Sequence, residues 1–544
     1  MNEVKGTPSA ALPWHVAFAF FLVAVLRSLP FIATRLSHDP RVAYLPIGYI
    51  PKDFLQYIAL IRQAGAAGPL TLENPFTTQP QSGRIILLFH TLLGQLAAWT
   101  HIDPFWMFEL SRIPLLAVLA WVLWRFLTPI LPDTGHRAWA CWLVAFSGGL
   151  EFLVRPLGAH LPPIIAPRTG QDLWHLFGWN SFESFYNPLW IAALILLLVV
   201  LRPLLQPGGP RSWKDGTQAA LGLIALYFTH PYTGVAVVPI VAVYLVLRLI
   251  FRDGAVLHDG LRIALALLPA ALIIAPISAW QNQDDVFKLS SRNAFGSQEI
   301  AVFWYPIGLG ALCVFVLLGW RRFIAEAHPW RFALGGWMIA VALLHSSPLI
   351  NGYKFLWMLH VPVCIVAAPA VADAFAALWP LRKPLALAML AVLFAANLEL
   401  SYRCLDEVQG IYPNGSLINP DYLAAAQAIA AAPDGPVLAA PALGNIIPAY
   451  GPQHVYVGHW FMTPNFIEKS REYDQLVAYL ESSDVTPQLD SSVRQFVSEH
   501  KFRYVVIPTR AAARAQAILG PTIVRTVDAR SLTILELQFE AEPH

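Results

Sequence analysis

Charged residues are scarce in this sequence, and their scarcity excludes an ordinary soluble protein. Asp, Glu, Lys and Arg make up 13% of the 544 residues, whereas 56% of the residues are hydrophobic. Soluble domains average about 25% charged residues. The mean hydropathy of +0.53 agrees with this difference, so the composition indicates a polytopic α-helical membrane protein.

Cysteines and basic tracts are also few. Cys141, Cys313 and Cys364 fall inside apolar runs, and Cys404 stands alone at the end of the last run. Neither a disulfide framework nor a cysteine metal site is predicted, and the cysteines are interpreted as packing residues. The sequence has no Lys/Arg-rich tract and no zinc-finger spacing, so nothing points to nucleic acid as a partner.

Apolar runs dominate the first three quarters of the chain. The run over 14–36 is too long for a signal peptide and has no small-residue cleavage site, so it predicts a retained helix. Runs of about 20 residues, enough to cross a bilayer, recur up to Tyr402. Charged residues then return to the density of a soluble protein. We therefore predict a transmembrane domain over 1–402 and an extracytoplasmic domain over 403–544.

Basic residues in short loops predict the topology, because Lys and Arg mark the cytoplasmic side. If the first helix runs outward and 85–99 is an amphipathic or re-entrant segment, every inner loop is basic. Counting 85–99 as a span would place the later basic clusters outside. The predicted topology has about 11 transmembrane helices and outer loops over 37–103 and 155–185. The composition is compatible with a bacterial inner (cytoplasmic) membrane. The predicted spans are 14–36, 104–126, 137–154, 186–201, 217–230, 232–250, 262–280, 302–319, 331–347, 355–376 and 385–402.

The first outer loop contains a carboxylate among aromatic residues, in "YIPKDFLQYIALIRQAG". The helical periodicity after Asp53 places Phe54 and Ile58 on one face, which is typical of a helix lying in the membrane interface. Asp53 would begin this helix as an N-cap or first-turn acid. Such a residue can be a helix cap alone, or a catalytic carboxylate at the outer membrane surface, with Lys52 and Tyr57 beside it.

The second outer loop and the span ends supply further polar residues. Asp172, His175 and Glu183 lie among tryptophans, as in sites that hold sugars between rings and carboxylates; a hydrogen-bonded loop with interfacial tryptophans is the alternative. Lysine or arginine at headgroup level can hold a lipid phosphate or can only snorkel. The span ends contribute His230, Tyr232, Arg292, Tyr353 and Lys354.

The tail predicts a small α/β domain. Short apolar segments such as "GPVLAAP", "HVYVGHW" and "RYVVIPT" alternate with helical patterns, which favours a mainly parallel sheet, and the last pair, around "DARS", favours an antiparallel edge hairpin. His459 and Trp460 in "GHWFMTPNF" follow a predicted strand, where α/β folds place binding loops. Trp460 could instead pack the tail onto the membrane domain.

Taken in order, these motifs resemble the GT-C superfamily of integral membrane glycosyltransferases, which includes protein O-mannosyltransferases, oligosaccharyltransferases and aminoarabinose transferases. The resemblance rests on the acid in "PKDFLQYIALIRQAGAAGPLTLENPF", then "LLFHTLLGQLAAW", "FSGGLEFL", "THPYTG" and "NGYKFLWMLHVP". The tail stretch "VYVGHWFMTPNFIEKSREYDQL" is similar to the outer domains of bacterial members.

The resemblance implies a polyprenyl-phosphate sugar donor and transfer at the outer face to a glycan, lipid or protein acceptor. Asp53 matches the first-loop acid, which acts as general base or orients the acceptor in an inverting displacement. No nucleotide or other cofactor is implied. The second loop lacks a D-x-D or D-x-E pair, so a divalent metal stays open but no clear motif supports one and no metal ligand is assigned; Lys354 or Arg292 can supply positive charge instead. The candidate residues are Asp53, Glu183 and Asp172 for catalysis, and Lys52, Tyr57, His175, His230, Tyr232, Arg292, Tyr353, Lys354 and His459 for substrate binding.

Two other classes stay open. In a lipid or glycan transporter or flippase, Asp53 and Lys354 would be binding or coupling charges. Such proteins place ionisable groups in mid-span and contain symmetry-related repeats. Arg27 and Glu109 fall within predicted spans, but no inverted repeat is evident. The third class is a non-catalytic scaffold of a membrane complex.

Overall fold

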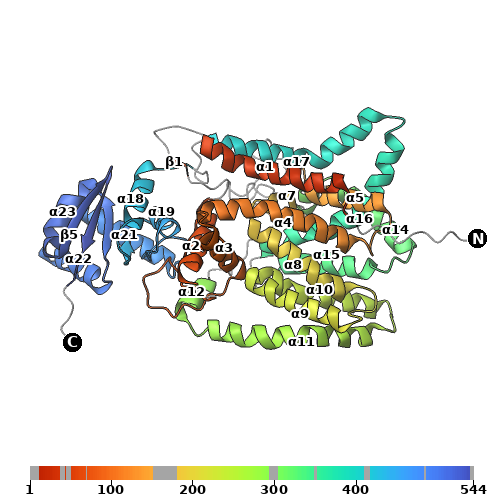
Figure 1. The fold of residues 1–544 in the computed structure, drawn as a ribbon, viewed down its shortest axis with the longest axis horizontal. Helices are drawn as coiled ribbons and strands as arrows, with labels where there is room; N and C mark the ends of the chain where they lie inside the picture. Colours follow the sequence, from red (N-terminus) through yellow and green to blue (C-terminus); the bar gives the residue numbers. More distant parts are fainter. Residues whose placement is uncertain are drawn as a thin grey trace, which may run out of the picture. The chain divides into compact units, whose positions relative to one another are not determined.

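The computed structural model describes residues 11–36, 43–44, 51–68, 70–150, 181–292, 304–347, 352–409, 417–482 and 486–539 (Figure 1). The chain divides into two compact units. The helical unit comprises Met1–Leu29, Glu109–Pro276 and Phe295–Leu405, and the loop-and-tail unit comprises Pro30–Phe108, Ile277–Ala294 and Asp406–His544.

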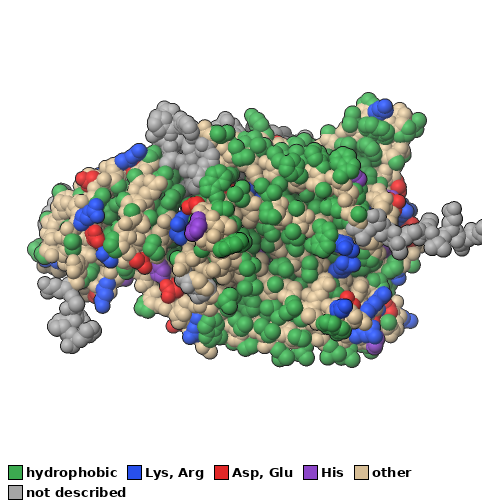
Figure 2. Space-filling view, in the orientation of Figure 1, with side chains coloured by type: hydrophobic (Ala, Val, Ile, Leu, Met, Phe, Trp, Pro, Cys, Tyr) green, Lys and Arg blue, Asp and Glu red, His purple; other side chains and the backbone are tan. Residues whose placement is uncertain are grey.

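Seven helices of the described residues are long and apolar enough to cross a membrane. Their hydrophobic side chains remain exposed along the helix sides, as on Leu261, Leu265 and Leu272, and Figure 2 shows hydrophobic side chains covering much of the visible helical surface. A surface of this kind is stable against lipid chains but not against water. The seven are α1 (Trp14–Leu36), α4 (Pro104–Leu127), α8 (Pro188–Leu205), α10 (Pro231–Ile250), α11 (Val256–Gln281), α16 (Trp357–Leu378) and α17 (Lys383–Gln409).

Shorter helices coincide with the four remaining predicted spans. They are α5 (Thr134–Phe146), α9 (Trp213–Thr229), the pair α13 (Trp304–Leu309) and α14 (Leu312–Ala325), and α15 (Arg331–His345). Two helices rather than one cover the predicted span over 302–319, because the chain turns at Gly310, which takes a φ of +59° between α13 and α14. Every predicted span thus overlaps a helix, and the count of about eleven crossings stays a prediction.

Helix starts in the helical unit follow local capping chemistry. Asp133 accepts a hydrogen bond from the backbone N–H of His136 at 2.8 Å and begins α5. Ser212 and Asp215 form a reciprocal capping box at the start of α9. These bonds satisfy backbone donors that have no partner inside a helix. The helices enclose a core with Trp124, Trp337 and Trp357 fully buried, to which α7 (Ser181–Ser184) and η3 (Gly352–Phe355) are attached.

The loop-and-tail unit begins with two helices that meet closely, α2 (Pro51–Ala67) and α3 (Leu88–Thr100). A Cβ on Gly94 would lie 2.5 Å from the carbonyl oxygen of Ile61, so only glycine permits this approach. With 13 residues, α3 is shorter than the roughly 20 residues that cross a bilayer. The assignment of this segment to an outer loop stays a prediction, since α5, which coincides with a predicted span, also has 13 residues. The unit also contains α12 (Asp285–Arg292) and the two-stranded pair β1 (Ala43–Tyr44) and β2 (Leu417–Ile418).

The tail forms a four-stranded sheet in the order β3-β4-β6-β5. Only β3 and β4 are parallel, and β6 is antiparallel to both of its neighbours. The prediction of a mainly parallel sheet is therefore wrong: the "DARS" hairpin forms as expected, but its second strand returns between β4 and β5. The segment "HVYVGHW" contributes an isolated bridge from Val455 to Val437 in place of a strand. The strands are β3 (Val437–Leu438), β4 (Tyr504–Pro508), β5 (Ile523–Ala529) and β6 (Leu532–Leu537).

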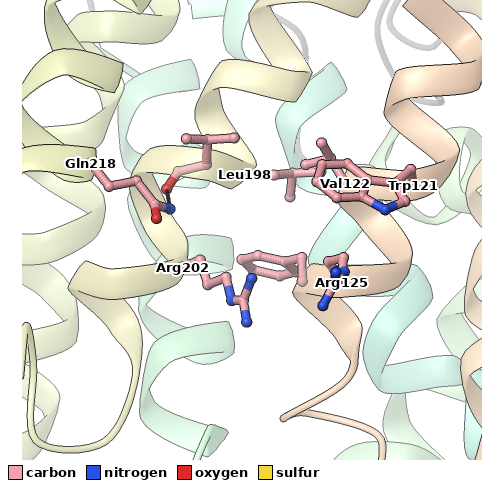
Figure 3. Close-up of a pocket in the computed structure, with 8 residues that line it drawn as sticks. Trp121, Val122, Arg125, Leu198, Arg202 and Gln218 are labelled. Atoms are coloured by element: carbon pink, nitrogen blue, oxygen red, sulfur yellow. Dashed lines mark hydrogen bonds between the residues drawn. The ribbon is translucent and has the colours of Figure 1, made fainter. Parts of the chain in front are cut away.

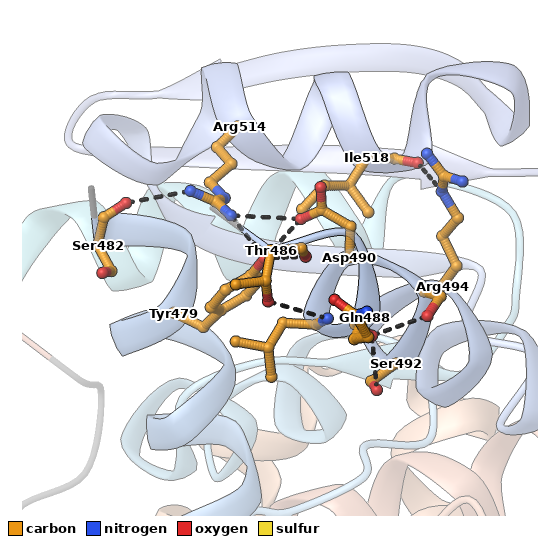
Figure 4. A network of polar contacts seen from close by, with 11 residues as sticks. Tyr479, Ser482, Thr486, Gln488, Asp490, Ser492, Arg494, Arg514 and Ile518 are labelled. Carbon is orange, nitrogen blue, oxygen red and sulfur yellow. Dashed lines mark hydrogen bonds and ion pairs between the residues drawn. The ribbon is translucent and has the colours of Figure 1, made fainter. Parts of the chain in front are cut away.

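Helices α21, α22 and α23 of the tail are joined by a polar network (Figure 4). Arg514 donates to the hydroxyl of Tyr479 at 2.6 Å and to Asp490 at 3.3 Å, and Tyr479 donates to Asp490 at 2.6 Å. The hydrogen bond from Tyr479 and the nearby Arg514 hold the pKa of Asp490 below its usual value. The helices of the tail are α18 (Pro420–Ala430), α19 (Pro441–Gly444), α20 (Ile447–Tyr450), α21 (Phe466–Glu481), α22 (Pro487–Glu499), α23 (Thr509–Leu519) and η4 (Gly520–Thr522).

Candidate functional site

Asp53 lies in the first turn of α2, as predicted, and faces a histidine from the tail. Nε2 of His459 is 3.5 Å from Oδ1 of Asp53. The Asp53 side chain is 49% exposed and the His459 side chain is 2% exposed. The carboxylate can therefore reach a substrate while its neighbour is fixed in protein. Sequence reasoning nominated both residues, but not their contact.

His459 is held in an aromatic surrounding. Its ring centroid lies 5.8 Å from that of Phe76 and 6.2 Å from that of Trp460. Within the described residues, neither ring nitrogen makes a hydrogen bond. A buried polar group without a partner costs about 1–3 kcal/mol, and the 3.5 Å separation from Asp53 is slightly longer than a hydrogen bond. A small shift of either side chain would convert this approach into a charge-assisted hydrogen bond.

The loop that carries His459 is fixed to the first outer loop. Thr463 accepts a hydrogen bond from the backbone N–H of Gly458 at 3.1 Å and donates to the carbonyl oxygen of Phe76 at 3.0 Å. The buried side chain of Asn74 donates to the carbonyl of Met462 at 2.6 Å. The position of His459 thus depends on residues of the first outer loop and of the tail, which are far apart in the sequence.

The loop between α2 and α3 is fixed in turn by α12. Asn74 donates to the hydroxyl of Ser290 at 3.1 Å, and Asp284 accepts from the N–H and the hydroxyl of Ser82 at 2.7 and 2.6 Å. Burial raises the pKa of Asp284, but the bonds from Ser82 and from the N–H of Phe287 outweigh it and hold the pKa below the usual value. Sequence reasoning missed Asn74 and Asp284. The only signal was their position in polar segments beside apolar runs.

A buried lysine supports the same loop. Nζ of Lys469 donates to the hydroxyl of Thr77 at 3.3 Å and lies 4.8 Å from the ring centroid of Tyr456. Burial lowers the pKa of Lys469 to about 8. Tyr456 donates to the carboxylate of Glu472, and burial together with this carboxylate raises the pKa of the phenol.

A second cluster lies within the helical unit, at the junctions of α9 with α10 and of η3 with α16. Nζ of Lys354 is 3.3 Å from the hydroxyl of Tyr232 and 4.3 Å from its ring centroid. Nδ1 of His230 is 2.7 Å from the hydroxyl of Thr233. Three predicted substrate residues thus meet in one place, two from the α9–α10 junction and one from η3.

Two tryptophans complete this second cluster. The rings of Trp190 and Trp357 stack at 5.9 Å with an interplanar angle of 13°. The His230 ring lies 6.4 Å from Trp190 and 6.5 Å from Trp357. A cation, a phenol and flat aromatic faces in one place can bind an anion and a sugar ring.

The structure describes only some of the other predicted site residues. Tyr57 packs in an aromatic cluster, 5.1 Å from His90 and 6.0 Å from Phe108 between ring centroids. Asp172 and His175 lie outside the described residues. Four further side chains are likewise not described, those of Lys52, Glu183, Arg292 and Tyr353. Trp460, which is 50% exposed, lies beside His459.

Buried charges occur inside the helical unit. Arg112 pairs with Glu109 at 2.8 Å and donates to the carbonyl of Tyr186 at 2.7 Å. The guanidinium of Arg27 donates to the carbonyl of Phe182 at 2.9 Å and lies 3.6 and 3.9 Å from the ring centroids of Phe182 and Tyr186. These contacts join α1, α4 and the segment before α8.

The described residues do not fit a metal site on their own. They contain no group of three or more His, Cys, Asp or Glu side chains that could hold a metal ion. Asp53 and His459 would supply two ligands at most, and the acids of the second outer loop are not described there.

Comparison with known proteins gave structural matches only. No protein-family model and no curated protein matches the chain. The fold is similar to that of an archaeal oligosaccharyltransferase from Archaeoglobus fulgidus, solved in complex with an inhibitory peptide and a dolichol-phosphate, at 13% identity and a TM-score of 0.48 over 93% of this chain and 71% of that chain. The same enzyme tethered to an acceptor peptide matches at 12% identity and a TM-score of 0.49, over 94% and 72% of the two chains.

Proposed function

We propose that the chain is a membrane glycosyltransferase that moves a sugar from a polyprenyl-phosphate donor to an acceptor at the outer membrane face. The observation that carries the proposal is the pairing of a half-exposed carboxylate, Asp53, with a buried histidine, His459. The motifs that resemble the GT-C superfamily supply the donor class, and the carboxylate supplies the chemistry.

In the proposed reaction, Asp53 accepts the proton of the acceptor hydroxyl or amide as that atom attacks the anomeric carbon. The bond from the anomeric carbon to the phosphate oxygen breaks, and the lipid phosphate leaves with the electron pair. Attack opposite the leaving group inverts the anomeric centre. A positioned base of this kind typically contributes about 10²–10⁴-fold to the rate.

Within the helical unit, Lys354 and Tyr232 are proposed to bind the phosphate of a polyprenyl-phosphate lipid. An ammonium and a phenol can each donate a hydrogen bond to a phosphate oxygen. The stacked Trp190 and Trp357, with His230 beside them, would provide the flat surface on which a sugar or isoprene unit packs. The Lys354–Tyr232 contact of 3.3 Å supports this role over simple snorkelling, because a snorkelling lysine extends into water.

The proposed topology follows the basic loops. The seven long helices and the four shorter ones would make about eleven crossings, with the N-terminus inside. Residues 1–402 would form the transmembrane domain, and the tail from 403 would lie outside, in a bacterial inner membrane. The donor side of the reaction would then face the compartment that holds surface glycans, lipids and exported proteins.

One observation favours a transporter as the second candidate. Three charged side chains within helices of the helical unit are almost fully buried. Arg27 is 0% exposed, Arg112 is 1% exposed and Glu109 is 3% exposed. Intramembrane charges of this kind mark transport pathways in many proteins. Their bonds to one another and to backbone carbonyls also fit a structural role that joins α1 to α4.

The experiment that separates the two functions uses membranes with a panel of radiolabelled polyprenyl-phosphate sugars. The glycosyltransferase proposal expects label to move from lipid to acceptor with one donor of the panel. It is wrong if no donor is consumed while labelled lipid crosses the bilayer in a protein-dependent way. Loss of that crossing in Arg27→Gln, with Asp53→Asn unchanged, would establish the transporter.

A further inference from the structure

A cavity of about 420 Å³ lies in the helical unit between α4, α8 and α9 (Figure 3). Arg125 and Trp121 line it from α4, Leu198 and Arg202 from α8, and Gln218 from α9. It lies toward the C-terminal ends of α4 and α8. The Lys354–Tyr232 cluster, by contrast, lies with Trp190 near the start of α8. The cavity is therefore separate from the proposed donor site.

Within the part of the chain that the structure describes, neither arginine of this cavity has a carboxylate partner. Within the described residues, Arg125 contacts the Trp121 ring at 5.4 Å while its buried Nε makes no hydrogen bond, and Arg202 has neither hydrogen bond nor ion pair. By comparison, Arg248 pairs with Asp253 at 2.7 Å and with Asp259 at 2.8 Å. Two unneutralised guanidinium groups at one cavity favour an anion, because both would gain charge-assisted hydrogen bonds.

The polarity of the cavity changes along the helix axes. Arg125 follows Trp121 by four residues in α4, and Arg202 follows Leu198 by four residues in α8. At 1.5 Å per residue, each arginine lies about 6 Å nearer the C-terminal end of its helix than the apolar residue. Figure 3 shows both arginines at one end of the cavity and Trp121 and Leu198 at the other. In the predicted topology, the arginine end faces the cytoplasmic leaflet.

We propose that this cavity binds an anionic phospholipid, with its phosphate on Arg125 and Arg202 and an acyl chain along Trp121 and Leu198. Basic pockets between membrane helices on the cytoplasmic side are suited to such headgroups. A lipid is favoured over free phosphate because Trp121 is 50% exposed beside the arginines and offers an apolar surface that an inorganic ion does not use. The bound lipid would bridge α4 and α8 and stabilise the helical unit.

The test measures lipid retention and thermal stability of the purified full-length chain. Wild type is compared with Arg125→Gln/Arg202→Gln, and with Arg262→Gln as the matched control, since Arg262 is an exposed arginine of α11 outside the cavity. Each protein is placed in nanodiscs of phosphatidylcholine with or without phosphatidylglycerol, and native mass spectrometry counts the phosphatidylglycerol retained. Inorganic phosphate and short-chain glycerophosphate are the competing probes.

The proposal expects wild type and Arg262→Gln to retain phosphatidylglycerol and to melt at higher temperature with it, and the double variant to lose both effects. Trp121→Ala should weaken retention of the long-chain lipid and leave glycerophosphate binding unchanged. Arg125→Lys/Arg202→Lys, which keeps both charges, should retain part of the effect and controls for folding. Equal retention by wild type and the double variant would overturn the proposal. Equal stabilisation by inorganic phosphate would overturn the lipid assignment.

Discussion

At the residue scale, the contact between Asp53 and His459 defines the proposed centre. In the proposed reaction the half-exposed carboxylate meets the acceptor, and the buried imidazole, 3.5 Å away, orients it. A local sequence pattern could nominate each residue but not pair them, because the contact is made by the fold of the loop-and-tail unit. Asn74 was not nominated at all, since a lone asparagine in a loop has no distinguishing pattern.

The first prediction concerns His459 as a positioning residue. His459→Ala should lower turnover about 10- to 100-fold with little change in KM for the donor, because a small shift would let His459 form a hydrogen bond to the Asp53 carboxylate, and a hydrogen bond to a charged group is worth about 1.5–3 kcal/mol. His459→Gln, which keeps a donor, should lose less. His454→Ala is the control, since that histidine lies by Glu73, at 3.6 Å. Equal activity of the two alanine variants would contradict the role.

The second prediction concerns Lys469, whose buried ammonium has a pKa lowered to about 8. An unfolded lysine titrates near 10.5, so between these values the unfolded chain binds more protons and stability rises with pH. Below pH 8 the folded chain carries the full free-energy cost of burying a charged ammonium group. Lys469→Met should therefore melt at higher temperature than wild type at pH 7, and the gap should narrow toward pH 10. A gap that does not depend on pH would show that the buried charge carries no such cost.

At the element scale, apolar periodicity predicted the helices, whereas strand order depended on contacts that no short segment encodes. Each predicted span overlaps a helix, but Gly310 divides one of them. In the tail, the β5–β6 hairpin was recognisable from its turn, yet the insertion of β6 beside β4 depends on the packing of the whole domain. The segment around Val455 has strand composition and still forms only a bridge, because it turns at once toward the His459 loop.

The third prediction concerns the crossing of α2 and α3. Gly94→Val should separate the helices, because even a Cβ would lie within 2.5 Å of the Ile61 carbonyl and 2.7 Å of Ala64. Overpacking of this kind costs about 1–3 kcal/mol or more, so the melting temperature and the transfer rate should both fall. Gly254→Ala is the control, since no atom lies within 4 Å of its added Cβ. A Gly94 variant that matches this control in both measurements would show that the crossing does not support Asp53.

At the scale of the whole molecule, the distribution of charge is the basis of the predicted topology. The seven long apolar helices were predictable because hydropathy acts over about 20 residues. The division into two units was not, because the first outer loop, α12 and the tail come from three separate parts of the chain. Long-range assembly of this kind leaves little trace in local sequence.

The fourth prediction tests the topology with cysteine labelling in a variant whose four native cysteines are replaced by alanine. Gln488→Cys in the tail should react with a membrane-impermeant maleimide in intact spheroplasts. Lys214→Cys, in a predicted inner loop, should react only after the membrane is opened. Both positions are exposed, so accessibility within the fold does not separate them. The reverse pattern would place the tail and Asp53 on the cytoplasmic side.

The central claim is tested most directly by the transfer rate of Asp53→Asn measured beside that of Asp103→Asn. Asp103 is a matched acid of the same unit, 47% exposed and 3.4 Å from Arg62. With the donor identified from the panel and equal protein in the membrane, Asp53→Asn should lose about 10²–10⁴-fold in turnover while Asp103→Asn stays near wild type. Wild-type turnover in Asp53→Asn would remove Asp53 from the chemistry and contradict the account.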